Sequence, residues 1–253
     1  MSLKNFLCYT YDESFIGLLT CVYEAYYRKE IPDEICKKDS LVSSFLYTYV
    51  DIKSDEDKFK KVYDALIEKI SKAFLQKLYF AFLSEAEGRE ILIYKYIRLG
   101  FKLKNDIEYN LHNEVVIEVN KLSKKVWYEK HRMLGFLRFK AIEKNVYYAP
   151  MEPDHNILEL ITPHFVHRFQ CENFIIHDVK RELASLYNGS EWIVVYLNKE
   201  EGKRLENSLD EGIYEKLWKE YFKSTAIKNR KNERLQKNYM PKRYWKYMLE
   251  TEE

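Results

Sequence analysis

Apolar residues recur at helical spacing through most of the first half of the chain, and this period constrains the fold more than any other feature. In one stretch they fall at positions i, i+3, i+4, i+7 and i+11, as Phe15, Leu18, Leu19, Val22 and Tyr26. A second apolar stripe runs from residue 59 to residue 78, and a third from 115 to 126. Residues 3–11, which precede these stripes, are typical of a strand. We therefore expect a first half that is mostly helical after one strand.

The pattern changes near residue 133, where short aromatic and β-branched runs replace the helical period. Strands are expected over residues 136–142, 146–149, 174–177, 183–187 and 192–197. Residues 143–145 and Asn188-Gly189 are typical of hairpin turns, so the sheet should be small and mostly antiparallel. Helices are expected over 158–169 and from 205 to 221.

These patterns predict an α+β fold, with a helix-rich first half, a sheet in the second half and a helical basic C-terminus. We expect a single domain over 1–253. The alternative subdivision has a helical part with one strand at 1–132, the sheet at 133–200 and the basic tail at 201–253. Capping residues mark the helix boundaries, with Asp12 or Ser14 before the first helix and Ser54 to Asp57 before the second. Gly100 lies where a helix is expected to end.

Composition excludes several classes of protein. The chain is 46% hydrophobic and 16% aromatic, which is far too rich for a disordered protein. No two of the seven glycines are closer than ten residues, so a glycine-rich phosphate-binding loop is excluded. The first residues lack a long apolar stretch and a small-residue cleavage site, which favours a cytoplasmic location. The four cysteines are widely spaced and form no C-x-x-C pair, so we expect reduced thiols and no metal cluster.

The net charge is only +2, but positive charge is concentrated in two segments. Residues 223–246 contain nine Lys or Arg and one acid, and residues 121–144 contain eight Lys or Arg and two acids. Two such segments in an otherwise acidic chain suggest a polyanionic partner. A solvated charged face is the other interpretation.

Aromatic residues interleave both basic segments, which favours nucleic acid as the polyanion. Cations contact phosphates, and aromatic rings stack on bases. If 136–142 is a strand, Arg138 and Lys140 share a face with Phe136. The residues expected to contact nucleic acid are Trp127, Arg132, Arg138, Lys140, Arg230, Lys231, Arg234 and Arg243. In the alternative, Tyr244 and Trp245 anchor the tail to the core while the lysines face water.

Four of the six histidines lie within residues 155–177, and two of them, His155 and His177, are next to an aspartate. Imidazole and carboxylate groups form metal sites and acid–base pairs, so the candidate catalytic residues are Asp154, His155, His177 and Asp178. Their spacing matches neither H-E-x-x-H nor the zinc deaminase pattern. We therefore favour structural hydrogen bonds for these histidines, with no metal or cofactor, and a capping role for Asp154 at the next helix.

Four stretches of the sequence, taken together and in order, resemble a known family. They are YDESFIGLLTCVYEAYYRKEIP, then MLGFLRFK with VYYAPMEPDHNIL, then PHFVHRF with FIIHDVKRELA, and finally LWKEYFKSTAIKNRKNERLQKNYMPKRYWKYM. They are similar to a bacterial family assigned to DNA metabolism or repair, encoded beside a radical SAM DNA modification protein. A related domain is fused to domains of the uracil-DNA-glycosylase type. The resemblance covers nearly the whole chain and is weakest over 37–110.

The resemblance implies two partners, DNA and the radical SAM protein, but no catalytic residues. Because the chain lacks the C-x-x-x-C-x-x-C cluster motif, radical chemistry would belong to the partner. The expected function is that of an accessory protein that binds nucleic acid and acts with this partner, without catalysis of its own. One alternative is an enzyme that processes nucleic acid or nucleotides through the His/Asp residues. Another is a protein-interaction scaffold.

Overall fold

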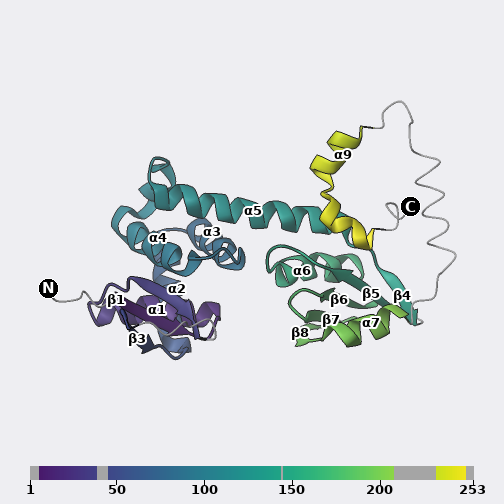
Figure 1. Cartoon of the computed structure of the whole chain (residues 1–253), viewed down its shortest axis with the longest axis horizontal. Coiled ribbons are helices and arrows are strands. Elements are labelled where there is room, and N and C mark those ends of the chain that lie inside the picture. Colours follow the sequence, from purple (N-terminus) through teal and green to yellow (C-terminus); the bar gives the residue numbers. More distant parts are fainter. Residues whose placement is uncertain (1–5, 39–44, 144, 208–231, 249–253) are drawn as a thin grey trace. The chain divides into compact units, whose positions relative to one another are not determined.

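The computed structural model describes residues 6–38, 45–143, 145–207 and 232–248 (Figure 1). Contacts within the chain divide it into two units, residues 1–127 and residues 128–253. The boundary falls inside helix α5 (Glu114–Phe136). Each unit contains one sheet together with helices, so the predicted α+β class is confirmed. None of the helices in the described ranges has both the length and the apolar character needed to cross a membrane.

Unit 1 contains a three-stranded parallel sheet in the order β2-β1-β3. Its elements before α5 are β1 (Phe6–Tyr11), α1 (Phe15–Tyr27), β2 (Glu34–Lys37), β3 (Tyr47–Asp51), α2 (Glu56–Lys69), α3 (Lys72–Leu83), α4 (Arg89–Leu103) and the 3₁₀ helix η2 (Lys104–Tyr109). The prediction of a single strand in the first half is therefore wrong. β2 and β3 have only four and five residues and are mostly half-buried or exposed, so they carry little hydrophobic pattern.

Side-chain caps explain where the helices of unit 1 begin. Ser14 Oγ accepts a hydrogen bond from the Gly17 amide (2.8 Å), and Asp55 caps α2 by accepting from the Lys58 amide (3.0 Å). Ser71 caps α3 in the same way. The apolar stripe from 59 to 78 is thus shared by two helices, because α2 ends at Lys69 and α3 begins at Lys72.

Gly100 permits close packing between helices and does not end one. Helix α4 continues to Leu103, so the predicted helix stop at Gly100 is wrong. A Cβ at this position would lie 2.7 Å from the Phe74 ring and 2.9 Å from Ile70 Cδ1. The Phe74 ring itself stacks on Tyr96, with 4.4 Å between the ring centroids. Glycine therefore lets α4 pack closely against the Phe74 ring of α3 at the core of unit 1.

Unit 2 contains a five-stranded sheet in the order β4-β5-β6-β7-β8, with β5–β6 as its parallel pair. Its elements after α5 are β4 (Lys140–Glu143), β5 (Val146–Met151), α6 (Leu158–Arg168), β6 (Asn173–Asp178), β7 (Leu183–Tyr187), β8 (Trp192–Tyr196), α7 (Lys199–Asn207), α9 (Glu233–Tyr239) and the 3₁₀ helix η4 (Lys242–Tyr247). The sheet predicted for the second half is confirmed as mostly antiparallel, including the β4–β5 and β7–β8 hairpins.

The strand predicted over 136–142 is wrong at its beginning. Helix α5 continues to Phe136, and β4 begins only at Lys140. The buried residues Val126, Met133 and Leu137 keep the helical period to the end of α5, which explains the extension. Helix α7 begins at Lys199, before the predicted 205, and residues 208–221 of that predicted helix lie outside the described residues.

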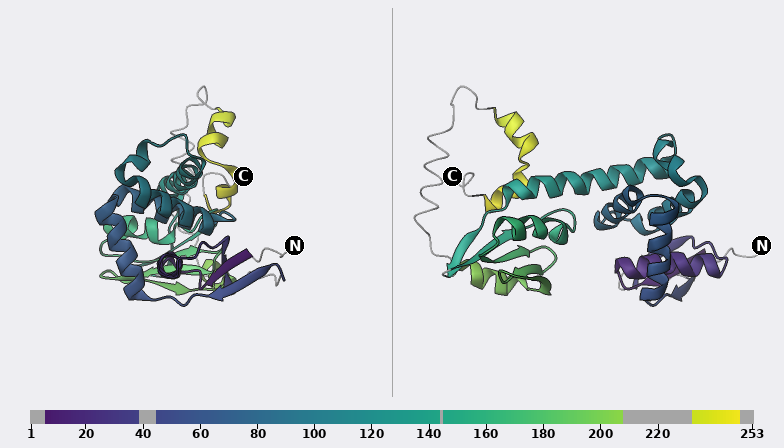
Figure 2. Two further views of the ribbon diagram at one scale, coloured as in Figure 1. Left: turned by 90° about the vertical axis from the view of Figure 1, so that its left-hand side faces the viewer. Right: turned by 180° about the vertical axis from the view of Figure 1, so that it is seen from behind.

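Two helices cover opposite faces of the second sheet (Figures 1 and 2). On the α6 side, the rings of Phe139, Phe165, Phe169 and Phe174 form a continuous aromatic cluster. On the α7 side, Gly202 lies so close to His177 that a Cβ would be 2.5 Å from the imidazole Cε1. Because successive residues of a strand face opposite sides of the sheet, His177 points to the α7 side, and its neighbours Ile176 and Asp178 point to the opposite side.

Candidate nucleic-acid interface

His177 lies near the end of β6 and is completely buried. Its Nε2 is 3.0 Å from the Leu197 carbonyl oxygen, which can only accept, so Nε2 carries the proton. Nδ1 then accepts a hydrogen bond from the Tyr148 hydroxyl at 2.7 Å. Burial lowers the pKa of His177, which keeps the ring neutral. Both ring nitrogens are therefore used within the protein in this arrangement.

Asp178 is completely buried and holds an arginine against the neighbouring loop. Arg181 Nη1 lies 2.7 Å from Asp178 Oδ2. The same guanidinium donates to the carbonyls of Pro153 (3.1 Å) and Asp154 (2.8 Å). Parallel pairing of β5 and β6 places Met151 opposite Asp178, which brings the loop after β5 within reach. Asp178 therefore positions Arg181, and Arg181 fixes the loop.

Asp154 and His155 are held through their backbone amides by Glu129 of α5. The buried Glu129 carboxylate accepts from the Asp154 amide (2.7 Å) and the His155 amide (2.8 Å). It also accepts from the Tyr244 hydroxyl of the C-terminal segment. The Asp154 side chain forms an ion pair with Arg243 (2.9 Å). The prediction that Asp154 caps the next helix is wrong, because Ile157 precedes α6 without a side-chain cap.

Glu129, Arg181 and Tyr244 thus act as a clamp on the loop over residues 152–156, and we call this group the loop clamp. It joins α5, the β5–α6 loop, the end of β6 and η4 within unit 2. Three of the four candidate catalytic residues take part in the clamp or are held by it, namely Asp154, His155 and Asp178. The geometry accounts for them as groups that order the loop and dock the C-terminal segment.

A pocket of about 300 Å³ lies beside this loop on the α7 side of the sheet. Its rim carries four lysines, Lys180, Lys199, Lys203 and Lys246, and two acids, Glu152 and Glu206. Burial opposes ionisation of Glu152, but hydrogen bonds from Lys246 and Tyr247 (both 2.6 Å) outweigh it and lower the pKa of Glu152. The rim therefore has a positive excess that suits an anionic group.

The residues expected to contact nucleic acid do not share one strand face. Trp127 and Arg132 lie on α5, and Trp127 is partly exposed. Arg138 lies between α5 and β4, where it donates to the Gly135 (2.7 Å) and Leu137 carbonyls at the helix end. Lys140 is the first residue of β4. The predicted common face of Phe136, Arg138 and Lys140 is wrong, because only Lys140 belongs to a strand.

The basic tail supplies two described arginines of the expected interface. Arg234 is an exposed residue of α9. Arg243, on η4, pairs with Asp154 and lies over the Tyr244 ring at 4.7 Å. Both side chains of the Arg243–Asp154 pair are about half exposed, at 50% and 49%. Arg230 and Lys231 lie outside the described residues.

A larger cleft, of about 730 Å³, lies entirely within unit 1 between α1, α2 and α4. Its base is apolar, formed by Val22, Val62, Ala65 and Ile97. Aromatic rings line it, and two of them are largely open to solvent, Tyr26 at 78% and Tyr27 at 64% exposed. The Tyr23 and Tyr27 rings stack on each other, with 4.2 Å between centroids. We call this feature the tyrosine cleft.

Cations surround these rings. Lys29, Lys61, Lys69 and Arg98 line the tyrosine cleft against a single acid, Glu30, which accepts a hydrogen bond from Tyr9. Lys61 Nζ lies 5.7 Å from the Tyr23 ring centroid, and the Arg98 guanidinium lies 5.7 Å from that of Tyr94. Rings for stacking and cations for phosphates are the combination that single-stranded nucleic acid requires.

One group of side chains among the described residues has metal-binding spacing. Cys8, Glu34 and Cys36 place two sulfurs and a carboxylate oxygen within 4.8 Å of one another in the first sheet. All three belong to unit 1, on β1 and β2.

Comparison with protein families gives one match. Residues 87–250 match a family described as a domain of unknown function, DUF4130, and this range is more than half of the chain. The chain belongs to the DUF4130 family. No curated protein and no solved structure matches it.

The DUF4130 match contains the loop clamp and the lysine-rimmed pocket, together with one wall of the tyrosine cleft. Glu129, Arg181 and Tyr244 all fall inside residues 87–250. On α4, the cleft residues Tyr94, Arg98 and Phe101 also fall inside, whereas those of α1 and α2 precede the match. The Cys8–Glu34–Cys36 group precedes it as well.

Sequence reasoning missed the residues that build these features. Tyr26, expected on the apolar stripe of its helix, is instead largely exposed. Tyr23, Tyr26 and Tyr27 have the i, i+3 and i+4 spacing that places side chains on one helix face, which is a signal available from the sequence. In the sequence, Glu129 is one of only two acids within the basic segment 121–144. Its role depends on Tyr244, which is 115 residues away, so no local pattern indicates it.

Proposed function

We propose that this protein binds single-stranded DNA in the tyrosine cleft and assists a radical SAM enzyme in DNA metabolism or repair. The observation that carries the proposal is the pairing of exposed tyrosines with four cations in one cleft. The partner and the biological process rest on the resemblance of the four sequence stretches. The DUF4130 match is compatible with this proposal and adds no function of its own.

The cleft favours a single strand over a duplex for a physical reason. Bases in a duplex have both faces covered by their neighbours, whereas an unpaired base can stack on a protein ring. Tyr26 and Tyr27 offer such rings at the surface, and Lys61, Lys69 and Arg98 lie beside them to contact phosphates. This arrangement predicts binding without strong sequence preference, because every base has an aromatic face.

The lysine-rimmed pocket and the Arg243–Asp154 pair supply further contacts in unit 2. Half-exposed ion pairs contribute only about 0–1 kcal/mol, so a phosphate can replace Asp154 as the partner of Arg243 at little cost. Arg132, Lys140 and Arg234 extend the positive charge of this unit. Together with the residues of the basic segments named from the sequence, they remain predicted DNA contacts.

The experiment is a fluorescence anisotropy titration of labelled single-stranded and double-stranded DNA with the full chain. We expect tighter binding of the single strand. The double variant Tyr26→Ala/Tyr27→Ala should weaken it by about 5- to 140-fold for each base whose stacking is lost, because such stacking contributes about 1–3 kcal/mol. Tyr109→Ala is the matched control, since Tyr109 is 84% exposed on η2 and does not line the cleft. Equal affinities of the double variant and wild type would refute the cleft as the binding site.

Experiments on the same full-chain protein distinguish this function from the two alternatives, a protein-interaction scaffold and an enzyme. A scaffold binds the radical SAM protein after nuclease treatment and has no affinity for DNA. An enzyme that uses the histidines loses its activity in His155→Ala or His177→Ala while the fold stays intact. DNA binding that depends on the cleft, with recruitment of the radical SAM protein, is the result expected of the accessory function.

A further inference from the structure

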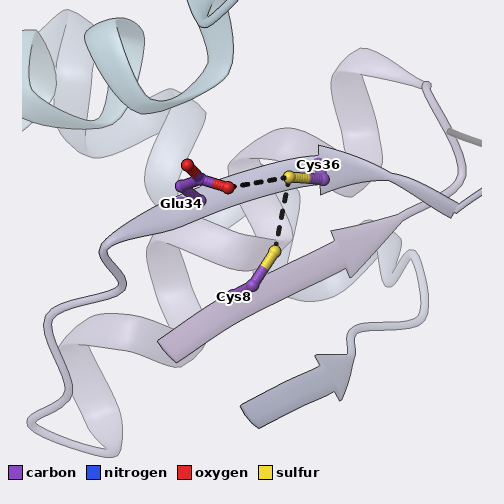
Figure 3. Close-up of side chains that lie close together, drawn as sticks. All are labelled: Cys8, Glu34 and Cys36. Atoms are coloured by element: carbon purple, nitrogen blue, oxygen red, sulfur yellow. Dashed lines mark hydrogen bonds between the residues drawn. The ribbon is translucent and has the colours of Figure 1, made fainter. Parts of the chain in front are cut away.

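Cys8 and Cys36 lie on adjacent parallel strands and face each other across them (Figure 3). Their Sγ atoms are 3.3 Å apart, and Cys36 Sγ is 3.7 Å from Glu34 Oε2. In the strand register, Cys8 is opposite Glu34, and Thr10 is opposite Cys36. The two cysteines are therefore diagonal neighbours on one face of the sheet, with the glutamate beside them.

We infer that Cys8, Glu34 and Cys36 bind a zinc ion, with the fourth position open to water. Zinc takes thiolate sulfur at about 2.3 Å and carboxylate oxygen at about 2.0–2.2 Å in tetrahedral geometry. Two sulfurs on one such ion are about 3.8 Å apart, so the present pair needs to separate by only about 0.5 Å. The ligand oxygen and both sulfurs already lie within 4.8 Å of one another.

Strand geometry favours a metal bridge over a disulfide between the two cysteines. Adjacent strands are separated by about 4.8 Å, and diagonal residues are also offset by about 6.6 Å along the strand, which puts their Cα atoms about 8 Å apart. A disulfide requires a Cα separation of about 4.4–6.8 Å. The backbone of β1 or β2 would have to shift to form the disulfide, whereas an ion between the sulfurs needs only small side-chain movements.

The surroundings support a zinc ligand set in two further ways. Tyr47 on β3 donates a hydrogen bond to Glu34 Oε1 (3.0 Å), which leaves Oε2 directed toward Cys36. In metal sites, a hydrogen bond to the oxygen that does not bind the ion orients a ligand carboxylate. Cys8 is completely buried and Cys36 is half-buried, which keeps the two sulfurs away from bulk water, whereas the exposed Glu34 leaves the fourth position accessible to it. Two soft thiolates select zinc over calcium or magnesium, which prefer oxygen alone.

The test uses the reduced, metal-free full chain, titrated with Co²⁺ and then with Zn²⁺. We expect one equivalent of Co²⁺ to produce thiolate-to-cobalt charge-transfer absorption, and Zn²⁺ to remove it by displacement. Zn²⁺ should also raise the thermal unfolding midpoint of wild type. Cys171→Ser is the matched control and should behave like wild type, because Cys171 is exposed in unit 2.

Variants of the ligands make the inference falsifiable. Cys36→Ser should abolish the charge-transfer absorption and the thermal shift, and Glu34→Gln should weaken Co²⁺ binding by at least tenfold. Glu34 is exposed, so this second variant keeps the test valid if Cys36→Ser does not fold. Absorption that persists in Cys36→Ser, a wild-type Co²⁺ affinity in Glu34→Gln, the absence of absorption from wild type, or a Cys8–Cys36 disulfide in the protein prepared without reductant would each overturn the inference. No DNA is present, so the result is independent of the proposed function.

Discussion

Replacing Glu129 by glutamine is expected to destabilise unit 2, because this buried carboxylate receives three hydrogen bonds. Its Oε1 accepts from the Asp154 amide and the Tyr244 hydroxyl, and its Oε2 accepts from the His155 amide. Glutamine has nearly the same shape but only one acceptor oxygen. If that oxygen takes the Oε1 position, the new amide group points its hydrogens at the His155 N–H.

The size of this loss of stability follows from the hydrogen bonds that Glu129→Gln changes. One bond to a charged acceptor, worth about 1.5–3 kcal/mol, is replaced by two donors that face each other. The two remaining bonds change from charge-assisted to neutral and become weaker. We therefore expect the free energy of unfolding to fall by about 2–4 kcal/mol. With a urea dependence of about 2–3 kcal/mol per molar, the midpoint falls by about 1 M.

Urea unfolding followed by circular dichroism and tryptophan fluorescence measures this effect. Trp245 is in η4 beside Tyr244, so its fluorescence also reports release of the C-terminal segment. Glu118→Gln is the matched control, since Glu118 is an exposed residue of the same helix. It should change the free energy of unfolding by less than about 0.5 kcal/mol. A Glu129→Gln protein as stable as this control would refute the role assigned to the loop clamp.

Three further predictions concern pH, packing and charge. Because burial lowers the pKa of His177, the unfolded chain binds a proton at this residue more readily than the folded chain does. The free energy of unfolding should therefore lose nothing to His177 above about pH 6.5 and should fall below it by up to about 1.4 kcal/mol per pH unit. His177→Asn should flatten this part of a curve of unfolding free energy against pH. Gly100→Ala should lower the free energy of unfolding by about 1–3 kcal/mol in urea denaturation. Gly135→Ala is the control: its new Cβ has nothing within 4 Å, and alanine forms helix better than glycine, so it should leave the free energy of unfolding unchanged or raise it by up to about 1 kcal/mol. Neutralising Arg132, Lys140, Arg234 and Arg243 together should reduce the logarithmic salt slope of single-stranded DNA binding by about three units, and an unchanged slope would remove these residues from the interface.

The second sheet could be predicted because its signals are local. The runs 174–177, 183–187 and 192–197 are short, rich in β-branched and aromatic residues, and separated by recognisable turns. β2 and β3 were missed because parallel pairing with β1 stabilises them through backbone contacts that leave little side-chain pattern. The end of α5 is hard to place from sequence because Phe136 and Phe139 bracket it, and such aromatic spacing favours a strand when the longer helical period is ignored.

The candidate sites were less predictable because their residues are distant in sequence. Charge density in the two basic segments can be counted from the sequence, but the tyrosine cleft needs α1, α2 and α4 to be brought together. Likewise, Cys8 and Cys36 are 28 residues apart and meet only because β1 and β2 pair. Local patterns indicate which residues can bind a ligand, and tertiary packing decides which of them meet.

The central claim is that cations of the tyrosine cleft contact the phosphates of single-stranded DNA. The most direct test is the salt dependence of binding for Lys61→Gln/Lys69→Gln/Arg98→Gln, compared with wild type and with Lys72→Gln. Lys72 is an exposed residue of α3 that does not line the cleft. Each phosphate contact contributes about 0.7 to the logarithmic slope for a single strand, so the triple variant should lose about two units and Lys72→Gln none. A triple variant with the wild-type slope would contradict the account.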